Sequence, residues 1–208
     1  MAGTRETFRA DFDVSRETTD RLETFSDLLA QWTARINLVA RGTLPDVWGR
    51  HFADSAQLWP LRPAGARRWL DLGSGAGFPG LVIAVIAAEQ EPELRVTLVE
   101  SDQRKAAFLR RAAATAGVSV DVHAVRAEAL APAGADVVSA RALAPLATLL
   151  RLAEKHRRRG GICLFPKGAT VHKELEATER TWRFDHRLHP SRTDPEAAIL
   201  EIGAMGRV

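Results

Sequence analysis

The amino-acid sequence predicts an α/β protein with a mostly parallel, seven-stranded sheet, an antiparallel edge strand and an N-terminal helical cap. Three observations support this fold class: apolar residues recur at helical spacing before residue 62, short apolar runs alternate with helical stretches after it, and only a loop separates the last two runs. The chain has 208 residues, and single cores reach about 250 residues before proteins split into domains. We therefore expect one domain over residues 1–208, with the cap at 1–62 and the α/β core at 63–208.

The N-terminal segment has the residue spacing of amphipathic helices. Within residues 15–36, apolar side chains recur at steps of three and four and so share one helix face; they are Leu22, Phe25, Leu28, Leu29, Trp32 and Ile36. Residues 44–61 repeat this spacing more loosely. His51, Asp54 and Ser55 are polar groups within that second, otherwise apolar stretch, and we expect them to bridge the cap to the sheet rather than contact RNA.

From residue 69 onward, short apolar runs typical of strands alternate with longer helical stretches. The expected strands occupy residues 69–73, 95–100, 118–125, 135–142, 162–168, 182–188 and 197–203. The expected helices occupy residues 80–89, 102–117, 144–161 and 171–181. This alternation favours right-handed crossovers and a parallel sheet covered on both faces. The last two strands are joined by a loop alone, which predicts an antiparallel pair at the edge of the sheet.

Composition argues against several classes of protein. The longest uninterrupted apolar run, residues 81–88, is far shorter than the ~20 residues that span a bilayer, and the N-terminus lacks the apolar stretch of a secretory signal. The single cysteine, Cys163, cannot form an internal disulfide, which fits a reducing compartment. We therefore expect a cytoplasmic protein with no membrane partner. No heptad or long apolar edge favours assembly, so we also expect a monomer.

Residues 70–80 read LDLGSGAGFPG and form a glycine-rich turn after the first expected strand. Gly73 and Gly75 lack a Cβ, so the chain can turn sharply there and lie close to a ligand. Glu100 ends the second expected strand, where an acid can accept hydrogen bonds from two adjacent ribose hydroxyls. The loop and the acid together predict a nucleoside site beyond the carboxyl ends of the strands. The alternative is a structural turn followed by a helix-capping acid.

Two glycine patterns overlap in this loop. Residues 75–80 match the dinucleotide pattern G-x-G-x-x-G, but that register leaves Asp71 inside the strand. Counting from Gly73 gives D-x-G-x-G-x-G, which resembles motif I of the Rossmann-like S-adenosylmethionine methyltransferases. That cofactor has no pyrophosphate and carries a sulfonium cation, so nearby acids and carbonyls suit it. We favour S-adenosylmethionine as the cofactor and keep a dinucleotide as the alternative.

Two further positions fit the rim of a nucleoside pocket. Ala127 and Glu128 follow the third expected strand, where a loop can border the adenine; the alternative for Glu128 is a surface acid. Arg141 ends the fourth expected strand, at the rim where a methyl donor faces its acceptor. The alternative for Arg141 is an ordinary surface charge, but its place at the rim favours a role in the site.

Seven segments of the sequence match those of one known family and occur in the same order along the chain. They are LLAQWTARINLVA (28–40), HFADSAQL (51–58), LDLGSGAGFPGLVIA (70–84), VTLVESDQRKAAFLR (96–110), RAE (126–128), SARALAPL (139–146) and PKG (166–168). With these segments the chain resembles the bacterial 16S ribosomal RNA guanine-N7 methyltransferase G family, also called glucose-inhibited division protein B. Thr33 and Val39 depart from the family pattern, which has asparagine and threonine there, and the chain beyond about Thr170 is too divergent for transfer.

The resemblance implies a Rossmann-like class I S-adenosylmethionine methyltransferase fold with S-adenosylmethionine as cofactor. Position by position, the resemblance assigns cofactor binding to Gly73, Phe78, Ala127, Glu128 and Arg141, and Glu100 is placed at the ribose. It further implies methyl transfer to N7 of one guanine in the 530 stem-loop of 16S ribosomal RNA, as RNA or as a small-subunit particle. Guanine N7 carries an in-plane lone pair and no proton, so attack on the methyl needs no general base, and we name no catalytic residue.

Basic side chains agree with an RNA partner. The net charge is +3 and the isoelectric point is about 9.6, because arginine dominates the cations. Our candidate contacts to RNA are Lys167, at the carboxyl end of an expected strand, and Arg110 and Arg111 on the second crossover helix. The cations at 157–159 also fit the last turn of a helix, where they complement the helix dipole.

Other chemistries have little support in the sequence. His186 and His189 lack acid or cysteine partners at zinc spacing, so we expect no metal site. Cys163 lies in the apolar run ICLF and is expected in the core. Neither a serine-hydrolase motif nor a P-loop lysine is present. Two alternatives stay open: a methyltransferase for a small molecule or protein, and a non-catalytic module of the dinucleotide-binding type.

Overall fold

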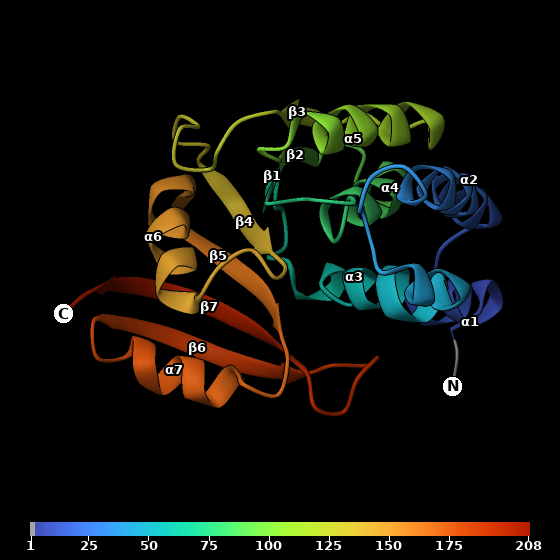
Figure 1. Cartoon of the computed structure of the whole chain (residues 1–208). Coiled ribbons are helices and arrows are strands. Elements are labelled where there is room, and N and C mark those ends of the chain that lie inside the picture. The colour runs from blue at the N-terminus through green and yellow to red at the C-terminus, as the bar shows by residue number, and fades with distance from the viewer. Residues whose placement is uncertain (1–2) are drawn as a thin grey trace.

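A seven-stranded sheet runs through the centre of the protein (Figure 1). The computed structural model describes residues 3–208, so residues 1 and 2 of the expected cap lie outside the described range. The strands are β1 (Arg68–Leu72), β2 (Arg95–Val99), β3 (Asp121–His123), β4 (Ala135–Ala140), β5 (Arg157–Lys167), β6 (Trp182–Pro190) and β7 (Ala198–Arg207). Their order is β3-β2-β1-β4-β5-β7-β6; β1 to β5 pair in parallel, and β7 is antiparallel to both of its neighbours. The mostly parallel sheet with an antiparallel strand at one end is confirmed.

Helices cover both faces of the sheet. They are α1 (Arg5–Phe12), α2 (Arg16–Thr33), α3 (Asp54–Ala56), α4 (Gly80–Gln90), α5 (Gln103–Thr115), α6 (Leu146–His156) and α7 (Val171–Thr178). The first five lie on one side of the sheet and α6 and α7 on the other (Figure 1). Side chains that alternate along the strands fill two separate cores: Val137 packs on the α4 side and its neighbour Val138 on the α6 side. The α4 helix is apolar all round because it is buried between the sheet and α2.

The cap is helical, but its second half is broken into short turns. Residues 41–61 form a 3₁₀ turn (Arg41–Asp46), a π-helical turn (Trp48–Ala53), α3 and another 3₁₀ turn (Trp59–Leu61) in place of one loose helix. Pro45 lacks the N–H that an α-helix interior needs, which accounts for the first break. The additional helix α1 was not expected from the sequence; it has only eight residues, which is too short for a clear periodic pattern.

The expected helix over residues 144–161 is wrong at its C-terminal end. The α6 helix ends at His156, and β5 begins at Arg157, which pairs with Ala135 of β4. The three arginines at 157–159 are therefore strand residues and do not complement a helix dipole. Pairing with β4 is a long-range interaction that the local charge pattern does not indicate.

Cys163 lies in β5 and is fully buried, which confirms it as a core residue. Burial raises the pKa of its thiol to about 12, so the group stays protonated at neutral pH. Within residues 3–208, no helix is both long and apolar enough to cross a membrane, and no group of three or more His, Cys, Asp or Glu side chains is placed to hold a metal ion. The single-domain, cytoplasmic and monomer expectations stay predictions.

Candidate functional site

The glycine-rich loop joins β1 to α4 at the carboxyl edge of the sheet. Gly73, Gly75 and Gly77 have φ angles of 66°, 54° and 94°, a region that residues with a Cβ rarely adopt. The backbone N–H of Ser74 donates to the carbonyl of Val99 at 3.0 Å and so ties the loop to the end of β2. The glycines are therefore needed for the turn itself as well as for access to a ligand.

Asp71 supports this loop from inside the protein. Its carboxyl is fully buried in β1 and accepts hydrogen bonds from the Ser139 hydroxyl at 2.7 Å and from the Gly80 backbone N–H at 3.2 Å. Burial raises its pKa to about 6. Ser139 in turn accepts a hydrogen bond from the Trp69 indole at 2.8 Å. Asp71 therefore lies inside β1, so its position does not distinguish the two glycine patterns, contrary to the expectation from the sequence. It ties β1 to β4 and to the start of α4, and it lines neither of the two cavities described below.

A cavity of about 420 Å³ opens beside the loop, at the carboxyl ends of β1, β2 and β4; we call it the loop cavity. Its lining includes most of the residues that the resemblance assigns to the cofactor: Gly73, Glu100, Ala127, Glu128 and Arg141. The volume falls within the ~300–1,000 Å³ of small-molecule pockets. The structure therefore brings these sequence-predicted residues together around one space of suitable size.

Glu100 lines the loop cavity with only 8% of its surface exposed. One carboxylate oxygen accepts a hydrogen bond from the Gly75 N–H at 2.9 Å, and the other accepts one from the Asp102 N–H at 2.8 Å. A carboxylate has about four acceptor positions, so each oxygen can still accept a hydrogen bond from a ligand hydroxyl. The acid is thus fixed in orientation by backbone groups and fits the role of holding a ribose.

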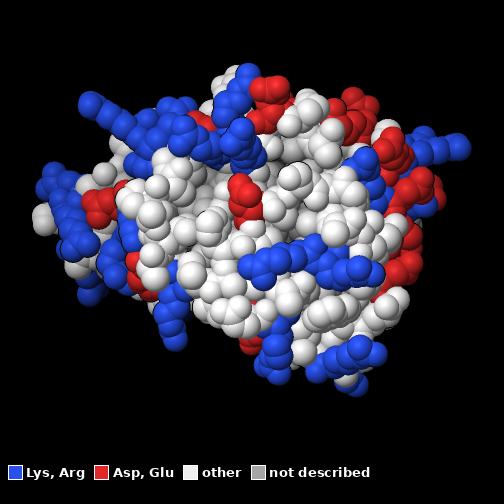
Figure 2. Space-filling view, turned by 90° about the horizontal axis from the view of Figure 1, so that it is seen from above, with Lys and Arg blue, Asp and Glu red and all other residues white. Residues whose placement is uncertain are grey.

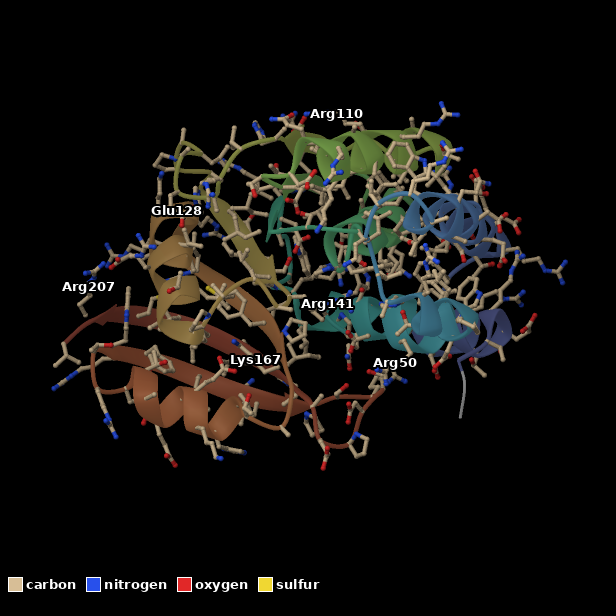
Figure 3. All side chains as sticks on the ribbon, viewed as in Figure 1. Arg50, Arg110, Glu128, Arg141, Lys167 and Arg207 are labelled. Atoms are coloured by element: carbon tan, nitrogen blue, oxygen red, sulfur yellow. The ribbon has the colours of Figure 1, made fainter. Side chains whose placement is uncertain are left out.

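Residues 127 and 128 follow β3 and are held against α6. The Ala127 carbonyl is 2.9 Å from His156 Nε2, and the Glu128 carbonyl accepts a hydrogen bond from Lys155 Nζ at 2.5 Å. The Glu128 carboxylate lies near the upper end of α6 (Figure 3), 3.8 Å from Arg151. Because the carbonyls point to α6, this loop has a defined position at the rim of the loop cavity.

Phe78 is the one sequence-predicted cofactor residue that does not line the loop cavity. Its ring is 3% exposed and stacks on His51, with ring centroids 4.8 Å apart and an interplanar angle of 13°. The Arg141 guanidinium carbon lies 5.1 Å from the centre of the same ring. Phe78 therefore connects the glycine loop to the cap, and a contact with the cofactor stays a prediction.

A larger cleft of about 880 Å³, which we call the cap cleft, lies beside the loop cavity. Its lining combines the cap with the far end of the sheet and includes Arg50, His51, Asp54, Lys167, Glu174 and Thr193. Both spaces share residues 141–144, which we call the shared wall. Arg141 lies centrally in Figure 3, between Lys167 and Arg50. Two ligands, one bound in each cavity, would therefore lie next to each other at the shared wall.

The three cations predicted to contact the substrate have different surroundings. Lys167 lines the cap cleft, but its side chain is only 10% exposed and its Nζ is 2.7 Å from Glu174. Arg110 and Arg111 lie on the outer side of α5 and line neither cavity, and the Arg110 guanidinium donates to the Val122 carbonyl at 3.0 Å. Figure 3 shows Arg110 at the upper edge of the molecule and Lys167 in its lower half. The structure thus does not bring these three residues together.

Charge is unevenly distributed over the surface. Figure 2 looks down on the molecule from above the view of Figure 1, and Lys and Arg side chains gather on its left side and in a central band. Acidic side chains gather instead along the right edge, on the side where α1 and α2 lie in Figure 1. A polyanion would therefore meet the side that carries α6 more favourably in this view.

Two polar residues of the cap reach the site, as the expected bridge requires. Asp54 Oδ2 is 3.2 Å from the Arg141 guanidinium, and His51 stacks on Phe78, so both contacts join the cap to the sheet. Ser55 does not take part, because its hydroxyl donates to the His51 carbonyl within its own helical turn. Sequence reasoning did not assign His51 or Asp54 to a cavity; their only signal was polarity within an apolar helical stretch.

His51 should make folding sensitive to acid. Burial, followed by the charges of Arg141 and Arg50, lowers its pKa from 6.5 to about 4. A folded-state pKa below the unfolded value means that stability present above pH 6.5 is lost as the pH falls toward 4, by at most about 1.4 kcal/mol per pH unit. A glutamine in place of His51 does not titrate, so His51→Gln should not show this acid-dependent loss of stability. In urea unfolding, the free energy of unfolding of the wild type should therefore exceed that of the variant by less as the pH falls. A constant gap would contradict the neutral, buried imidazole.

Sequence comparison relates the chain to one family. The family model described as "GidB: rRNA small subunit methyltransferase G" matches residues 18–195. A protein of Cereibacter sphaeroides (strain ATCC 17025 / ATH 2.4.3) named Ribosomal RNA small subunit methyltransferase G is 54% identical over 196 residues, which cover 94% of this chain and 94% of that protein. A protein of the same name from Rhodospirillum centenum (strain ATCC 51521 / SW) is 56% identical over 195 residues, which cover 94% of this chain and 88% of that protein.

Comparison with solved structures confirms the class I methyltransferase fold. An O-methyltransferase from Bacillus cereus in complex with SAH aligns with a TM-score of 0.57 at 15% identity, covering 88% of this chain and 91% of that one. TYW2 of M. jannaschii in complex with AdoMet aligns with a TM-score of 0.57 at 11% identity, covering 85% of this chain and 80% of that one. Identity this low shows the fold alone, whereas the family model spans most of the sequence. The chain therefore belongs to the rRNA small subunit methyltransferase G family, GidB.

Proposed function

We propose that the protein transfers a methyl group from S-adenosylmethionine to N7 of a guanine in the 530 loop of 16S ribosomal RNA. The observation that carries this proposal is the pair of adjoining cavities that share residues 141–144. The loop cavity has the acid and the bare backbone suited to a nucleoside. The cap cleft is about twice as large and opens beside it, which suits an RNA base with its flanking phosphates. Membership of the family supports the same reaction.

The residues of the loop cavity fit the proposed cofactor. When bound, S-adenosylmethionine supplies a methyl group made electrophilic by its sulfonium. Glu100 would accept hydrogen bonds from the two ribose hydroxyls with its free lone pairs, and Gly73 lines the space proposed for the methionine part, with the Leu143 side chain packed where a Cβ of residue 73 would lie. Ala127 and Glu128 would border the adenine from the rim. The B. cereus and M. jannaschii structures contain SAH and AdoMet, which supports this ligand class for the same fold.

The proposed chemistry needs positioning more than proton transfer. Guanine N7 is unprotonated and attacks the methyl carbon along the line of the carbon–sulfur bond, so no side chain must remove a proton. Alignment of two bound reactants can lower a barrier by about 7–11 kcal/mol. His51 fits this scheme because its lowered pKa keeps it neutral at physiological pH, and it adds no further charge to the cleft. The protein's task is to hold both reactants against the shared wall.

The RNA would enter through the cap cleft. Arg50 is an exposed cation in its lining, and Lys167 would have to exchange Glu174 for a phosphate in order to bind one. Arg110 and Arg111 would meet a more distant stretch of the RNA or of the small-subunit particle. We place this reaction in the cytoplasm, with 16S ribosomal RNA or the small subunit as the partner.

Two experiments test the proposal in vitro. Calorimetry should detect binding of S-adenosylmethionine and none of NAD; the opposite result would favour the dinucleotide module. Purified protein with labelled S-adenosylmethionine should then methylate 16S ribosomal RNA or small-subunit particles. An RNA that carries 7-deazaguanine in place of guanine is the matched control, because it lacks N7 and should receive no label. Labelling of that RNA would contradict transfer to N7.

A further inference from the structure

Arg141 occupies the boundary between the two cavities. Its side chain is 25% exposed, lines both spaces, and donates to Asp54 Oδ2 at 3.2 Å. The Asp54 side chain is 20% exposed, so this ion pair is better shielded from water than an ordinary surface pair. The Phe78 ring, 5.1 Å from the guanidinium carbon, supports Arg141 from another direction. The guanidinium is therefore held in one place at the shared wall.

Asp54 joins three separate parts of the chain at this point. One carboxylate oxygen binds Arg141, and the other accepts hydrogen bonds from the Thr193 hydroxyl at 3.0 Å and from Gln57 Nε2 at 3.0 Å. Gln57 also accepts a hydrogen bond from the Arg192 backbone N–H at 2.8 Å. The cap, the loop after β4 and the loop between β6 and β7 thus converge on one carboxylate.

The charge of this pair matters for the proposed reaction. During transfer the carbon–sulfur bond breaks and a carbon–N7 bond forms, so the positive charge of the sulfonium ends on the methylated guanine and no proton moves. One positive charge is therefore present near the shared wall throughout the step. An uncompensated Arg141 would repel it, and the interaction between charges is strong in a partly buried site. Asp54, at 3.2 Å from Arg141, offsets that charge.

We propose that Asp54 is a positioning residue for methyl transfer, which holds Arg141 in the shared wall and neutralises its charge. This inference rests on the proposed function. Without the carboxylate, the guanidinium can turn into either cavity and displace a reactant from its line of attack. Because displacement by about 1 Å can cost about 100-fold in rate, the effect should fall on the turnover number more than on binding.

The test is a set of variants assayed for methyl transfer to 16S ribosomal RNA. Asp54→Asn keeps the side-chain size and should lower kcat at least about 30-fold with less than about a threefold change in KM for S-adenosylmethionine. Asp54→Glu should recover part of the loss. Arg141→Gln should lower kcat similarly, and the double variant should be no slower than the slower single one, because both changes remove the same arrangement.

A matched control is the ion pair between Arg62 and Glu91, at 3.2 Å, which joins the cap to the C-terminal end of α4 and lines neither cavity. Glu91→Gln should leave kcat within about twofold of wild type. Thr193→Val keeps the charge of Asp54 and removes one hydrogen bond to it, so it should give an intermediate loss of kcat. This variant also tests the role of Asp54 in case Asp54→Asn does not fold. Wild-type kcat in Asp54→Asn or Thr193→Val, or additive losses in the double variant, would overturn the positioning role. Absence of methyl transfer by the wild type would instead overturn the proposed function.

Discussion

Glu100→Gln is expected to weaken binding of S-adenosylmethionine at least about 30-fold. The carboxylate is held by the N–H groups of Gly75 and Asp102 at 2.9 and 2.8 Å, and its free lone pairs are proposed to accept two ribose hydroxyls. Hydrogen bonds to a charged group are each worth about 1.5–3 kcal/mol, and the glutamine amide would turn a donor toward either a backbone N–H or a ribose hydroxyl. Calorimetry with purified protein measures the change.

Glu89→Gln is the matched control for this variant. Its carboxylate also accepts a hydrogen bond from a backbone N–H, that of Ser15 at 3.1 Å, and further bonds from the Ser15 and Thr18 hydroxyls at the start of α2. It lines neither cavity. Glu89→Gln should therefore lower the urea midpoint without changing affinity for S-adenosylmethionine. If Glu100→Gln binds as tightly as wild type, the assignment of Glu100 to the ribose is wrong.

Gly80→Ala is expected to destabilise the folded protein by about 1–3 kcal/mol. A Cβ at Gly80 would lie 2.4 Å from Leu98 Cδ2 and 2.7 Å from Asp71 Cβ, so α4 would have to move away from the sheet. Overpacking of this kind costs about 1–3 kcal/mol. The gain in helix propensity of about 1 kcal/mol acts in the opposite direction but is smaller than the steric cost. The Gly80 N–H would also lose its hydrogen bond to Asp71, now 3.2 Å.

Urea unfolding of Gly80→Ala beside Gly42→Ala measures this effect. A Cβ at Gly42 meets nothing within 4 Å, so that control should change the free energy of unfolding by less than about 0.5 kcal/mol. Wild-type stability in Gly80→Ala would mean that the start of α4 does not press on β1 and β2 as the structure shows. Because Gly80 begins α4, looser packing there should also weaken the glycine loop as a ligand site.

Sequence patterns predicted the α/β core well because its signals are local. The strands β1, β2 and β4 are short, mostly apolar runs that are buried along nearly their whole length, and polar residues such as Asp71 and Ser139 interrupt them only singly. Residues at the ends of parallel strands meet at one edge whatever the details of packing. The sequence alone therefore predicts that Glu100 after β2 and Arg141 after β4 lie beside the glycine loop, and both line the loop cavity.

Features that depend on distant partners were not predictable in this way. The local sequence around Arg157 predicts the end of a helix, but Arg157 pairs with Ala135 of β4 and so belongs to β5. The glycine pattern suggested that Asp71 lies near the ligand, but its carboxyl accepts hydrogen bonds from Ser139 and Gly80, and the local sequence does not indicate that β4 and α4 bring these partners to it. Asp54 likewise lies 87 residues from Arg141 in sequence. Polarity in an apolar stretch indicated that Asp54 would bridge two parts of the chain, but not which residue it would meet.

The most direct test of the proposed function is a map of N7-methylguanine in 16S ribosomal RNA from cells with and without the gene. Borohydride reduction followed by aniline cleaves RNA at N7-methylguanine, so each modified position gives one break that primer extension can locate. Deletion of the gene should remove a single break in the 530 loop, and the wild-type gene supplied in trans should restore it. Persistence of every N7-methylguanine break after deletion would contradict the proposed function.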